Sequence, residues 1–357
     1  MNYDIAVIGA GPAGAIFARQ IGIKCPELKV IMVNGAATDD KKRKPCGGLL
    51  APDAQKALAE FNLTLPKSIL ADPQIFAVET IDLDARVTKY YQRHYLNMDR
   101  YRFDDWLISL IPDTVNTIKG ICTSVEKKDH LFKIEYLENG IKQHIFSKYI
   151  VGADGANSIV RRSFFKVKLK QYVSIQQWFR NSGQPLPYYS CIFDSKTSDS
   201  CSWTIHKDEY LIFGGAFPKQ SCRNSFENQK KKLADFLKID LGSPIKTEAC
   251  LVSSPRKMSD FTCGKDGVFL IGEAAGFISS SSFEGISYAI LSGKYLANSF
   301  AKYRSQNSIL KSYRSKTFKM RLKLVMKNPK RFVICNPFLR KLVMKSGIQT
   351  VKNSPED

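Results

Sequence analysis

The sequence predicts an α/β fold with three parts: a Rossmann-like nucleotide-binding domain, an inserted β-rich domain, and a basic helical segment toward the C-terminal end. Three glycine-bearing motifs in a fixed order, at residues 9–14, 152–155 and 272–276, predict the first part. Alternating apolar patterns between the motifs predict the second part. A run of cations after residue 301 defines the third part.

The first motif stands between a predicted strand and a predicted helix. The apolar run at 4–8 has strand composition, and the apolar pattern at 15–20 is helical. Glycines in such a turn let the backbone approach a pyrophosphate, and the start of the helix offers the anion unpaired N–H groups. The residues that we expect to contact a dinucleotide here are Gly9, Gly11, Ala13 and Gly14.

The elements that follow are predicted from periodicity. A second strand at 30–33 ends at Asn34, and apolar residues from 286 to 300 mark one face of a long helix. Between them, the patterns predict a hairpin at 75–81 and 87–91, a helix at 103–111, strands at 121–125 and 132–136, and short strands from 172 to about 251.

These elements divide the chain into three regions. The cofactor domain is discontinuous because the inserted domain interrupts it twice. We assign residues 1–70, 97–170 and 256–300 to the cofactor domain, 71–96 and 171–255 to the substrate domain, and 301–357 to the basic helical segment.

Together the three motifs predict a flavin site. One glycine-rich turn is weak evidence because such turns are common, but three motifs in this order are hard to obtain by chance. The chain has no second fingerprint for a nicotinamide, so reducing equivalents are expected to arrive transiently from NAD(P)H or from another reduced carrier. The electron donor itself is left open.

Further segments accompany the motifs: KPCGG at 44–48, Arg100 before Phe103, SIVRR at 158–162 and EGI at 284–286. With the motifs, these segments resemble the p-hydroxybenzoate-hydroxylase-like flavoproteins and, within them, a bacterial branch of the geranylgeranyl reductase family. The resemblance covers residues from about 3 to 300. It implies bound FAD. It implies much less about the substrate, because proteins with this fold catalyse many different reactions.

The resemblance implies roles for individual residues. Arg100 would reach the FAD phosphates and ribityl chain as a fixed cationic fork. Cys122 would contact the adenine chiefly through its backbone, and Asp154 would act near the pyrophosphate. Asn34 stands where the family usually has Glu or Asp, so it can hydrogen-bond the adenosine ribose without a charge. Glu273 stands where Asp is usual and offers a ribityl hydroxyl a carboxylate that is one methylene longer.

The third motif leads through a serine-rich run into the long helix. The first N–H groups of that helix can face the N1 and O2 edge of a flavin, where positive potential stabilises the anionic reduced form. A serine-rich helix start is otherwise an ordinary capping device. The residues that we expect at the cofactor from this region are Gly272, Gly285 and Ile286.

Cys46 is the candidate catalytic residue. In the resembling reductases the turn that holds Cys46 and Gly47 lies over the flavin, where a thiol could donate a proton, shape the pocket or respond to redox state. The alternative is a small buried turn residue. Trp203 matches the central tryptophan of the family's Tyr-x-Trp-x-Phe substrate motif, but its flanking residues are Cys201 and Ile205, and packing in the core is an equal alternative.

We expect reduced flavin to pass hydride to a C=C bond of a prenyl or other lipid-like substrate, held in a dry apolar site. The second possibility is an aromatic or lipid-ring monooxygenase. A third, of another class, is a flavin-bound sensor or a membrane-recruited binding protein without turnover.

Cysteine and histidine usage predicts neither a disulfide framework nor a metal site. The nine cysteines form no CxxC pair and the four histidines are scattered. The apolar stretch at 5–18 lacks a basic leader and is broken by the first motif, so it does not predict a signal peptide. We expect a cytoplasmic protein, with peripheral attachment at the inner face of the membrane as an open alternative.

The net charge of +21 is concentrated in the C-terminal segment. Residues 301–355 contain fifteen Lys or Arg residues and no Asp or Glu, and bulky apolar residues stand between the cations. This mixture suits a helix on anionic lipid. The equal alternative is a solvated helical tail packed on the cofactor domain. Nucleic acid is an unlikely partner because no recognition fold accompanies the charge.

Overall fold

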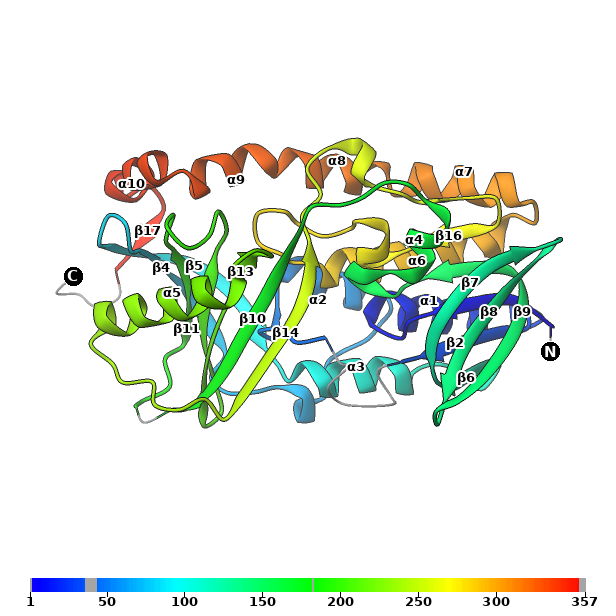
Figure 1. Cartoon of the computed structure of the whole chain (residues 1–357), viewed down its shortest axis with the longest axis horizontal. Coiled ribbons are helices and arrows are strands. Elements are labelled where there is room, and N and C mark those ends of the chain that lie inside the picture. The colour runs from blue at the N-terminus through cyan, green and yellow to red at the C-terminus, as the bar shows by residue number, and fades with distance from the viewer. Residues whose placement is uncertain (1, 36–43, 182, 353–357) are drawn as a thin grey trace.

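The computed structural model describes residues 2–35, 44–181 and 183–352. Two sheets lie along the length of the molecule, and helices from the C-terminal part of the chain follow one of its long edges (Figure 1). This arrangement is the predicted α/β fold, with a Rossmann-like domain, a β-rich domain and a basic helical C-terminal segment.

The first sheet has a parallel core that is covered on both faces, as is usual for parallel strands. Ile5, Val7 and Ile31 of this core are buried. Its strand order is β15-β16-β9-β1-β2-β6, and β7 and β8 extend β9 as an antiparallel meander. The bounds are β1 (Asn2–Ile8), β2 (Val30–Asn34), β6 (Val115–Lys119), β7 (Ile121–Lys128), β8 (Leu131–Glu138), β9 (Ile141–Gly152), β15 (Gly264–Lys265) and β16 (Val268–Leu270).

The helices of this domain surround the parallel core. Pro12 begins α1 at a position where its missing N–H costs no helical hydrogen bond. Gly293 of α6 lets the two helices pack closely, because a Cβ there would lie 2.6 Å from the Ala13 carbonyl oxygen. The bounds are α1 (Pro12–Lys24), α2 (Pro52–Ala59), α3 (Arg100–Ser109), α4 (Ile159–Phe164) and α6 (Ile286–Lys302), with 3-10 turns η3 (Lys67–Ile69), η4 (Gly155–Asn157), η5 (Met258–Asp260) and η6 (Gly272–Ala275).

The second sheet is antiparallel except where β11 pairs with β4. Its order is β14-β10-β13-β12-β11-β4-β5-β17, and β3 also pairs with β5. The predicted hairpin is confirmed as β4 and β5. The bounds are β3 (Leu49–Leu50), β4 (Ile75–Asp82), β5 (Val87–Asn97), β10 (Gln171–Arg180), β11 (Tyr188–Phe193), β12 (Ser202–Lys207), β13 (Tyr210–Pro218), β14 (Lys246–Ser253) and β17 (Thr350–Val351).

One helix within the second domain contradicts the sequence prediction. The expectation of short strands throughout 172–251 is wrong at α5 (Cys222–Leu237). Phe226, Gln229 and Leu233 of α5 are buried at helical spacing, and Phe226 packs against Phe213 and Phe217 of β13. Polar and basic residues fill the rest of this helix and hide that spacing in the sequence.

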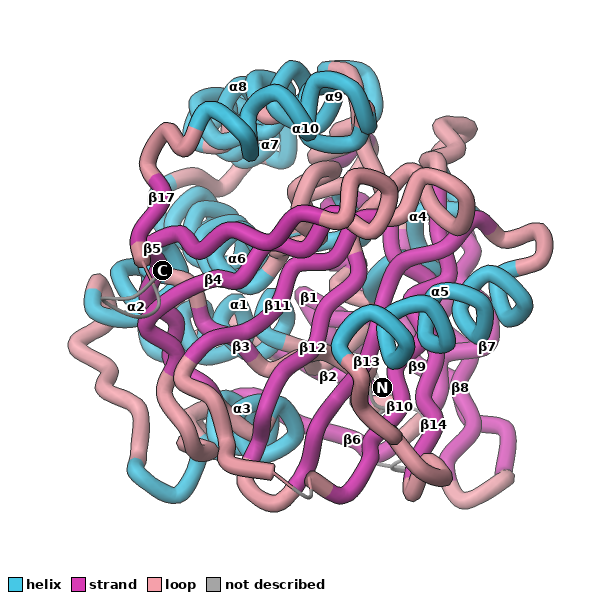
Figure 2. Tube along the Cα trace, turned by 90° about the vertical axis from the view of Figure 1, so that its left-hand side faces the viewer, coloured by secondary structure: helices cyan, strands magenta, loops and turns pink. Residues whose placement is uncertain are grey.

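The basic segment forms four helices that pass from one domain to the other. Figure 2 shows them as a layer along one edge of the molecule. Tyr313 is fully buried and its hydroxyl donates to the Leu270 carbonyl oxygen at 2.9 Å, so the first of these helices is packed on the cofactor domain. This packing does not decide between the lipid-bound and the solvated alternatives for the segment, and both stay predictions. The bounds are α7 (Gln306–Lys316), α8 (Phe318–Met326), α9 (Asn328–Cys335) and α10 (Pro337–Ser346).

The C-terminal segment does not stay helical to its end, because Thr350 and Val351 pair with β5 as strand β17. Among the described residues, we find no helix that is both long enough and apolar enough to cross a bilayer.

Candidate flavin site

A cavity of about 1700 Å³ is lined by both domains. It extends from the first glycine motif to the helices α9 and α10 of the C-terminal segment. Most residues predicted to bind the cofactor or substrate line this cavity: Gly9, Gly11, Ala13, Asn34, Cys46, Gly47, Arg100, Cys122, Asp154, Trp203, Glu273, Gly285 and Ile286.

Two predicted cofactor residues, Gly14 and Gly272, do not line the cavity and instead permit close packing beside it. A Cβ on Gly14 would lie 2.0 Å from the Gly9 carbonyl oxygen, and one on Gly272 would lie 2.8 Å from the Ala13 Cβ. Gly11 differs from both, since a Cβ there would meet no described atom within 4 Å. The first motif therefore presents open backbone at Gly11, as a pyrophosphate cradle requires.

Gly9 joins the first motif to the second. Its backbone has φ +104°, and a Cβ would lie 2.6 Å from the Ala153 carbonyl oxygen. Only glycine adopts this conformation without strain, and only glycine fits the space. The conformation holds the turn after β1 against the end of β9, where Asp154 follows.

Asp154 has one occupied and one open carboxylate oxygen. Its Oδ2 accepts from the backbone N–H groups of Ile159 (2.6 Å) and Val160 (3.3 Å) and so satisfies the start of α4. Its Oδ1 is buried and has no hydrogen-bond partner among the described residues. Burial raises the pKa of this carboxyl. A buried open acceptor beside the glycine cradle fits a bound group with hydroxyls, such as the ribose or ribityl parts of FAD.

Glu273 is held by two different segments. Lys44 donates to its Oε2, and the Ser253 backbone N–H donates to its Oε1 at 2.7 Å. Each carboxylate oxygen has a second lone pair, so a ribityl hydroxyl can still be accepted. The pair also fixes the KPCGG turn, because Lys44 begins that turn.

Arg100 also lines the cavity. Its Nε donates to Asp104 Oδ1 at 3.0 Å, and its side chain is largely buried. Burial opposes the charge, but Asp104 and the nearby Cys46 more than offset it and raise the pKa of the guanidinium. The remaining guanidinium donors suit phosphate oxygens.

The KPCGG turn rests on strand β12. A Cβ on Gly47 would lie 2.5 Å from Ile205 Cδ1 and 3.7 Å from Trp203 Nε1, so the turn lies close to the tryptophan. Cys46 Sγ accepts from the Gly48 N–H at 3.5 Å. Trp203 Nε1 is buried and has no acceptor among the described residues. The structure thus brings together the predicted catalytic thiol and the predicted substrate tryptophan.

Lys207, which sequence reasoning missed, lies beneath this turn. Its side chain is 4% exposed, and Nζ donates to Asn97 Oδ1 and to the Met98 carbonyl oxygen, each at 2.6 Å. Burial lowers the pKa of Lys207 to about 8. No signal distinguishes this lysine in the sequence, because the chain has 54 Lys and Arg residues and Lys207 stands at the end of a short strand.

Glu284 is a second missed residue, although the adjacent Gly285 and Ile286 were predicted. It lines the cavity before α6, and its Oε1 is buried without a partner among the described residues. Burial raises the pKa of its carboxyl. Glu284 belongs to the EGI segment at 284–286, which is part of the family resemblance, but only Gly285 and Ile286 of that segment were predicted to lie at the cofactor.

Asn34 and Cys122 line the cavity near the end of β2. Asn34 is buried, and its backbone carbonyl oxygen accepts from the Gly120 N–H at 3.2 Å. Burial raises the pKa of Cys122 to about 12, and its Sγ donates to the Ser124 carbonyl oxygen at 3.7 Å. A protonated, hydrogen-bonded thiol fits contact through the backbone and packing better than reactivity.

The opposite end of the cavity is rich in aromatic and aliphatic groups. Tyr95 and Tyr189 meet edge to face, with ring centroids 5.3 Å apart. Phe193, Trp203 and Val343 also line this end. The cavity lining on this side also includes the cations Arg93, Lys327 and Lys330, so one end of the cavity suits a nucleotide and the other suits a largely apolar ligand with a polar or anionic group.

Comparisons with known proteins agree with this geometry. Residues 125–328 match the family described as FAD binding domain. Protein CbrA of Shigella dysenteriae serotype 1 (strain Sd197) is 44% identical over 349 residues, which cover 97% of each chain.

Two solved structures share the fold at low sequence identity. A geranylgeranyl bacteriochlorophyll reductase-like protein from Thermoplasma acidophilum aligns with a TM-score of 0.81 and 19% identity, covering 99% of this chain and 94% of the other. PqsL from Pseudomonas aeruginosa, a probable FAD-dependent monooxygenase, aligns with a TM-score of 0.71 and 15% identity, covering 97% of this chain and all of the other.

The cradle at Gly11, the open acceptor of Asp154 and the guanidinium of Arg100 are the groups that FAD requires, and they line one cavity. The chain belongs to the FAD-binding family of flavoenzymes, an FAD-dependent oxidoreductase or monooxygenase-like fold, and within that family it groups with the CbrA proteins.

Proposed function

We propose that this flavoenzyme reduces C=C bonds of a prenyl or other lipid-like substrate. The observation that carries the proposal is the far end of the cavity, where aromatic and aliphatic side chains continue beyond Cys46 and Trp203. A prenyl chain needs apolar surface of this kind. The resemblance of the motifs to the geranylgeranyl reductase family supports the same choice.

The chain supplies the groups that hold the cofactor. The backbone at Gly11, the guanidinium of Arg100 and the carboxylates of Asp154 and Glu273 would bind the phosphates and hydroxyls of FAD. When bound and reduced, FAD supplies a hydride to the acceptor carbon. We propose that the reducing equivalents come from NAD(P)H or from another reduced carrier.

Hydride addition to a C=C bond also needs a proton at the neighbouring carbon, and we propose Glu284 as its source. Because burial raises the pKa of Glu284, its carboxyl retains a proton at higher pH than an exposed glutamate does. Its Oε1 has no partner within the described chain and lines the cavity. Cys46 is the second candidate, since it lines the cavity in the turn that lies close to Trp203.

Oxygen consumption separates this proposal from the two alternatives. Purified enzyme would be given NADPH with and without a prenyl alcohol, and both oxygen uptake and product mass would be followed. Alkene loss without stoichiometric oxygen uptake supports the reductase. Oxygen uptake coupled to a hydroxylated product would replace it with a monooxygenase, and absence of turnover with any tested lipid or aromatic would favour the binding protein.

A further inference from the structure

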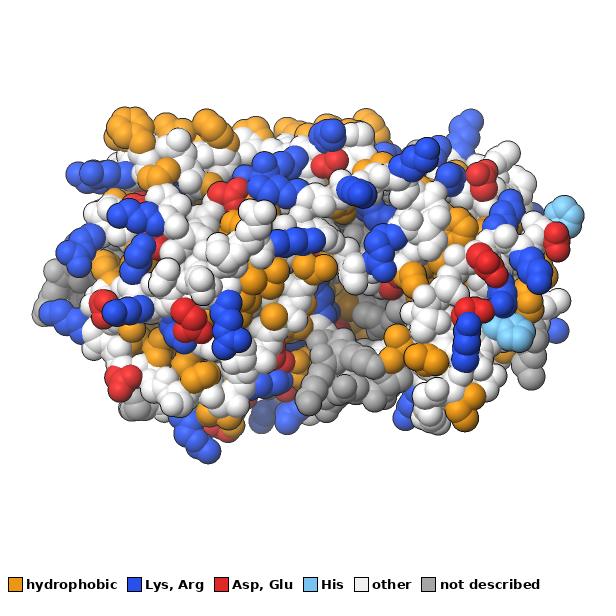
Figure 3. Space-filling view, in the orientation of Figure 1, with side chains coloured by type: hydrophobic (Ala, Val, Ile, Leu, Met, Phe, Trp, Pro, Cys, Tyr) orange, Lys and Arg blue, Asp and Glu red, His pale blue; other side chains and the backbone are white. Residues whose placement is uncertain are grey.

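The outer face of the C-terminal helices exposes a row of large apolar side chains. Single exposed apolar residues are ordinary, but a row over three consecutive helices is not. Figure 3 shows apolar side chains along the upper edge of the molecule, where these helices lie. The apolar ridge, as we call it, consists of residues that are 41 to 68% exposed: Phe318, Leu322, Met326, Phe332, Phe338 and Leu342.

The packing of α8 fixes the direction of its part of the ridge. Met320 and Leu324 are buried against the cofactor domain. Phe318, Leu322 and Met326 recur at intervals of four residues on another face of the helix, so they form one stripe that points outward.

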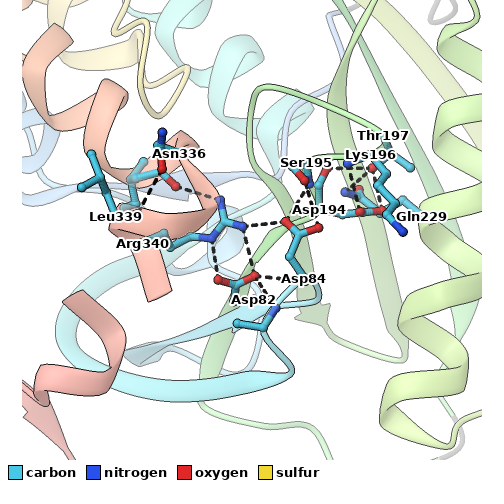
Figure 4. Close-up of polar contacts among 12 residues, drawn as sticks. Asp82, Asp84, Asp194, Ser195, Lys196, Thr197, Gln229, Asn336, Leu339 and Arg340 are labelled. Carbon is cyan, nitrogen blue, oxygen red and sulfur yellow. Dashed lines mark hydrogen bonds and ion pairs between the residues drawn. The ribbon is translucent and has the colours of Figure 1, made fainter. Parts of the chain in front are cut away.

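A buried ion pair fixes the direction of α10. Arg340 donates from Nε to Asp82 Oδ2 at 2.9 Å and from Nη2 to Asp82 Oδ1 at 3.0 Å, and Nη2 also contacts Asp84 Oδ2 at 2.8 Å (Figure 4). Such a two-point charged contact restricts rotation of the helix. Met344 is buried on the same side as Arg340, and Phe338 and Leu342 remain exposed.

Cations stand between the ridge residues along the chain, and acidic residues are absent from residues 301–355 of the sequence. Lys319, Lys341 and Lys345 are exposed on α8 and α10 beside the ridge residues. An apolar stripe bordered by lysines matches the interface of an anionic bilayer, where acyl chains meet negative headgroups.

The inner sides of α9 and α10 border the cavity. Ile334 and Met344 line it, and so do Val333, Val343 and Ile348, which are also exposed at the molecular surface. We take these solvent-accessible lining residues, of which Ile348 lies just beyond α10, as the mouth of the cavity at this end. The mouth is therefore formed by the same helices that bear the apolar ridge.

We propose that α8, α9 and α10 dock on an anionic lipid bilayer through the apolar ridge, and that the apolar substrate enters the cavity from the bilayer between α9 and α10. The docking stands on the ridge and its charges alone. The entry route rests on the proposed function, because it assumes a lipid-like substrate.

Docking is tested with the full FAD-bound chain and two sets of vesicles, phosphatidylcholine alone and phosphatidylcholine with phosphatidylglycerol. We expect sedimentation with the anionic vesicles at low salt and weaker binding as the screening length falls from ~30 Å at 0.01 M to ~8 Å at 0.15 M. Absence of binding to anionic vesicles at low salt would overturn the docking.

The ridge is tested with the triple variant Phe332→Ser, Phe338→Ser and Leu342→Ser. The matched control replaces Phe76, Ile141 and Ile245 by Ser, since these residues are also exposed, at 55 to 62%, but lie away from the C-terminal helices. We expect the ridge variant to lose about tenfold or more in vesicle affinity and the control to lose little. Equal losses, with FAD retained in both, would overturn the role of the ridge.

The charges are tested with Lys319→Gln, Lys341→Gln and Lys345→Gln, against Lys127→Gln, Lys128→Gln and Lys231→Gln, which make the same change of net charge elsewhere. Only the first set should weaken binding to anionic vesicles. Sedimentation velocity of the free protein completes the test: a dimer that the ridge substitutions dissociate, without vesicle binding, would identify a second copy as the occupant and overturn the proposal.

The entry route is tested through the flavin spectrum. A short prenol added in solution should perturb the spectrum equally in the wild type and in the ridge variant, whereas a long prenol delivered in anionic vesicles should perturb only the wild type. Equal perturbation by vesicle-borne prenol would overturn the entry route. No perturbation by any prenol contradicts the proposed function and the entry route together, while the sedimentation results still decide the docking.

Discussion

Lys44 and Glu273, which are 229 residues apart in the sequence, form an ion pair in the wall of the cavity. The pair joins the turn that carries Cys46 to the third glycine motif. The second oxygen of Glu273 accepts from the Ser253 N–H of β14, so the contact also includes the second domain. The cofactor wall and the substrate wall are therefore tied together at one carboxylate.

Removing the charges nearest the cofactor should weaken FAD binding. Arg100→Ala and Glu273→Ala each delete a charge-assisted contact, with an expected loss of roughly 1.5–3 kcal/mol. Titration of the apoprotein with FAD measures the change, and Arg102→Ala is the control because its side chain is 67% exposed on the same helix. If both cavity variants bind FAD as tightly as the control, neither residue belongs to the site.

Two glycines of the first motif should respond differently to the same methyl group. In Gly14→Ala the Cβ would lie 2.0 Å from the Gly9 carbonyl oxygen, so the fold itself should be destabilised. In Gly11→Ala the Cβ projects into open cavity, so thermal stability of the apoprotein should persist while FAD affinity falls. Melting of the apoproteins together with FAD titration makes the comparison. Equal melting temperatures for the two variants would contradict this division of roles.

Lys207 should make the free energy of unfolding depend on pH in the alkaline range. Burial lowers its pKa in the folded protein to about 8, while the unfolded chain keeps its ordinary value of 10.5. Between these values the unfolded state binds more protons, so stability should rise with pH, by at most about 3 kcal/mol. Below pH 8 the folded protein carries the charge and the gain is absent.

Urea unfolding of the wild type and of Lys207→Met at pH 7.5 and pH 9.5 tests this dependence. We expect the wild type to gain more stability than the variant between the two values. Parallel behaviour of the two proteins would show that Lys207 titrates normally.

The buried ion pair of α10 should contribute much more stability than an exposed pair of the same segment. Arg340→Met leaves Asp82 charged and buried, with an expected cost of about 3–5 kcal/mol. Lys323→Met, which removes the exposed pair with Asp53, should cost less than about 1 kcal/mol. Urea unfolding compares them. Similar losses would mean that Arg340 does not hold α10 on the second domain.

Periodicity and motif order were sufficient to predict the fold class and the strands that carry the motifs. Val30 to Asn34, for example, is a short apolar run that ends in a polar residue, and it forms β2 as expected. The helix α5 was missed because only three of its sixteen residues are buried, so the polar face dominates its composition.

The candidate site was predicted only where the residues stand in a motif. Gly11 and Asp154 could be predicted because their neighbours in the sequence complete recognisable motifs, and both residues line the cavity. Lys207 is buried by contacts with Asn97 and Met98, which are 110 and 109 residues away in the sequence, and local sequence does not encode such burial. The mouth at α9 and α10 depends likewise on Arg340 meeting Asp82, which is 258 residues away.

Anaerobic reoxidation of the reduced enzyme tests the proposed reaction most directly. The FAD-bound protein would be photoreduced without oxygen and then mixed with a prenyl alcohol, while flavin absorbance and product mass are followed. We expect absorbance of the oxidised flavin to return and each reoxidised flavin to yield one product richer by two hydrogen atoms. We also expect slower return of this absorbance in Glu284→Gln, which retains the shape of Glu284 but supplies no acidic proton. A flavin that stays reduced with every prenyl substrate, and reoxidises only when oxygen is admitted, would contradict the proposed reduction.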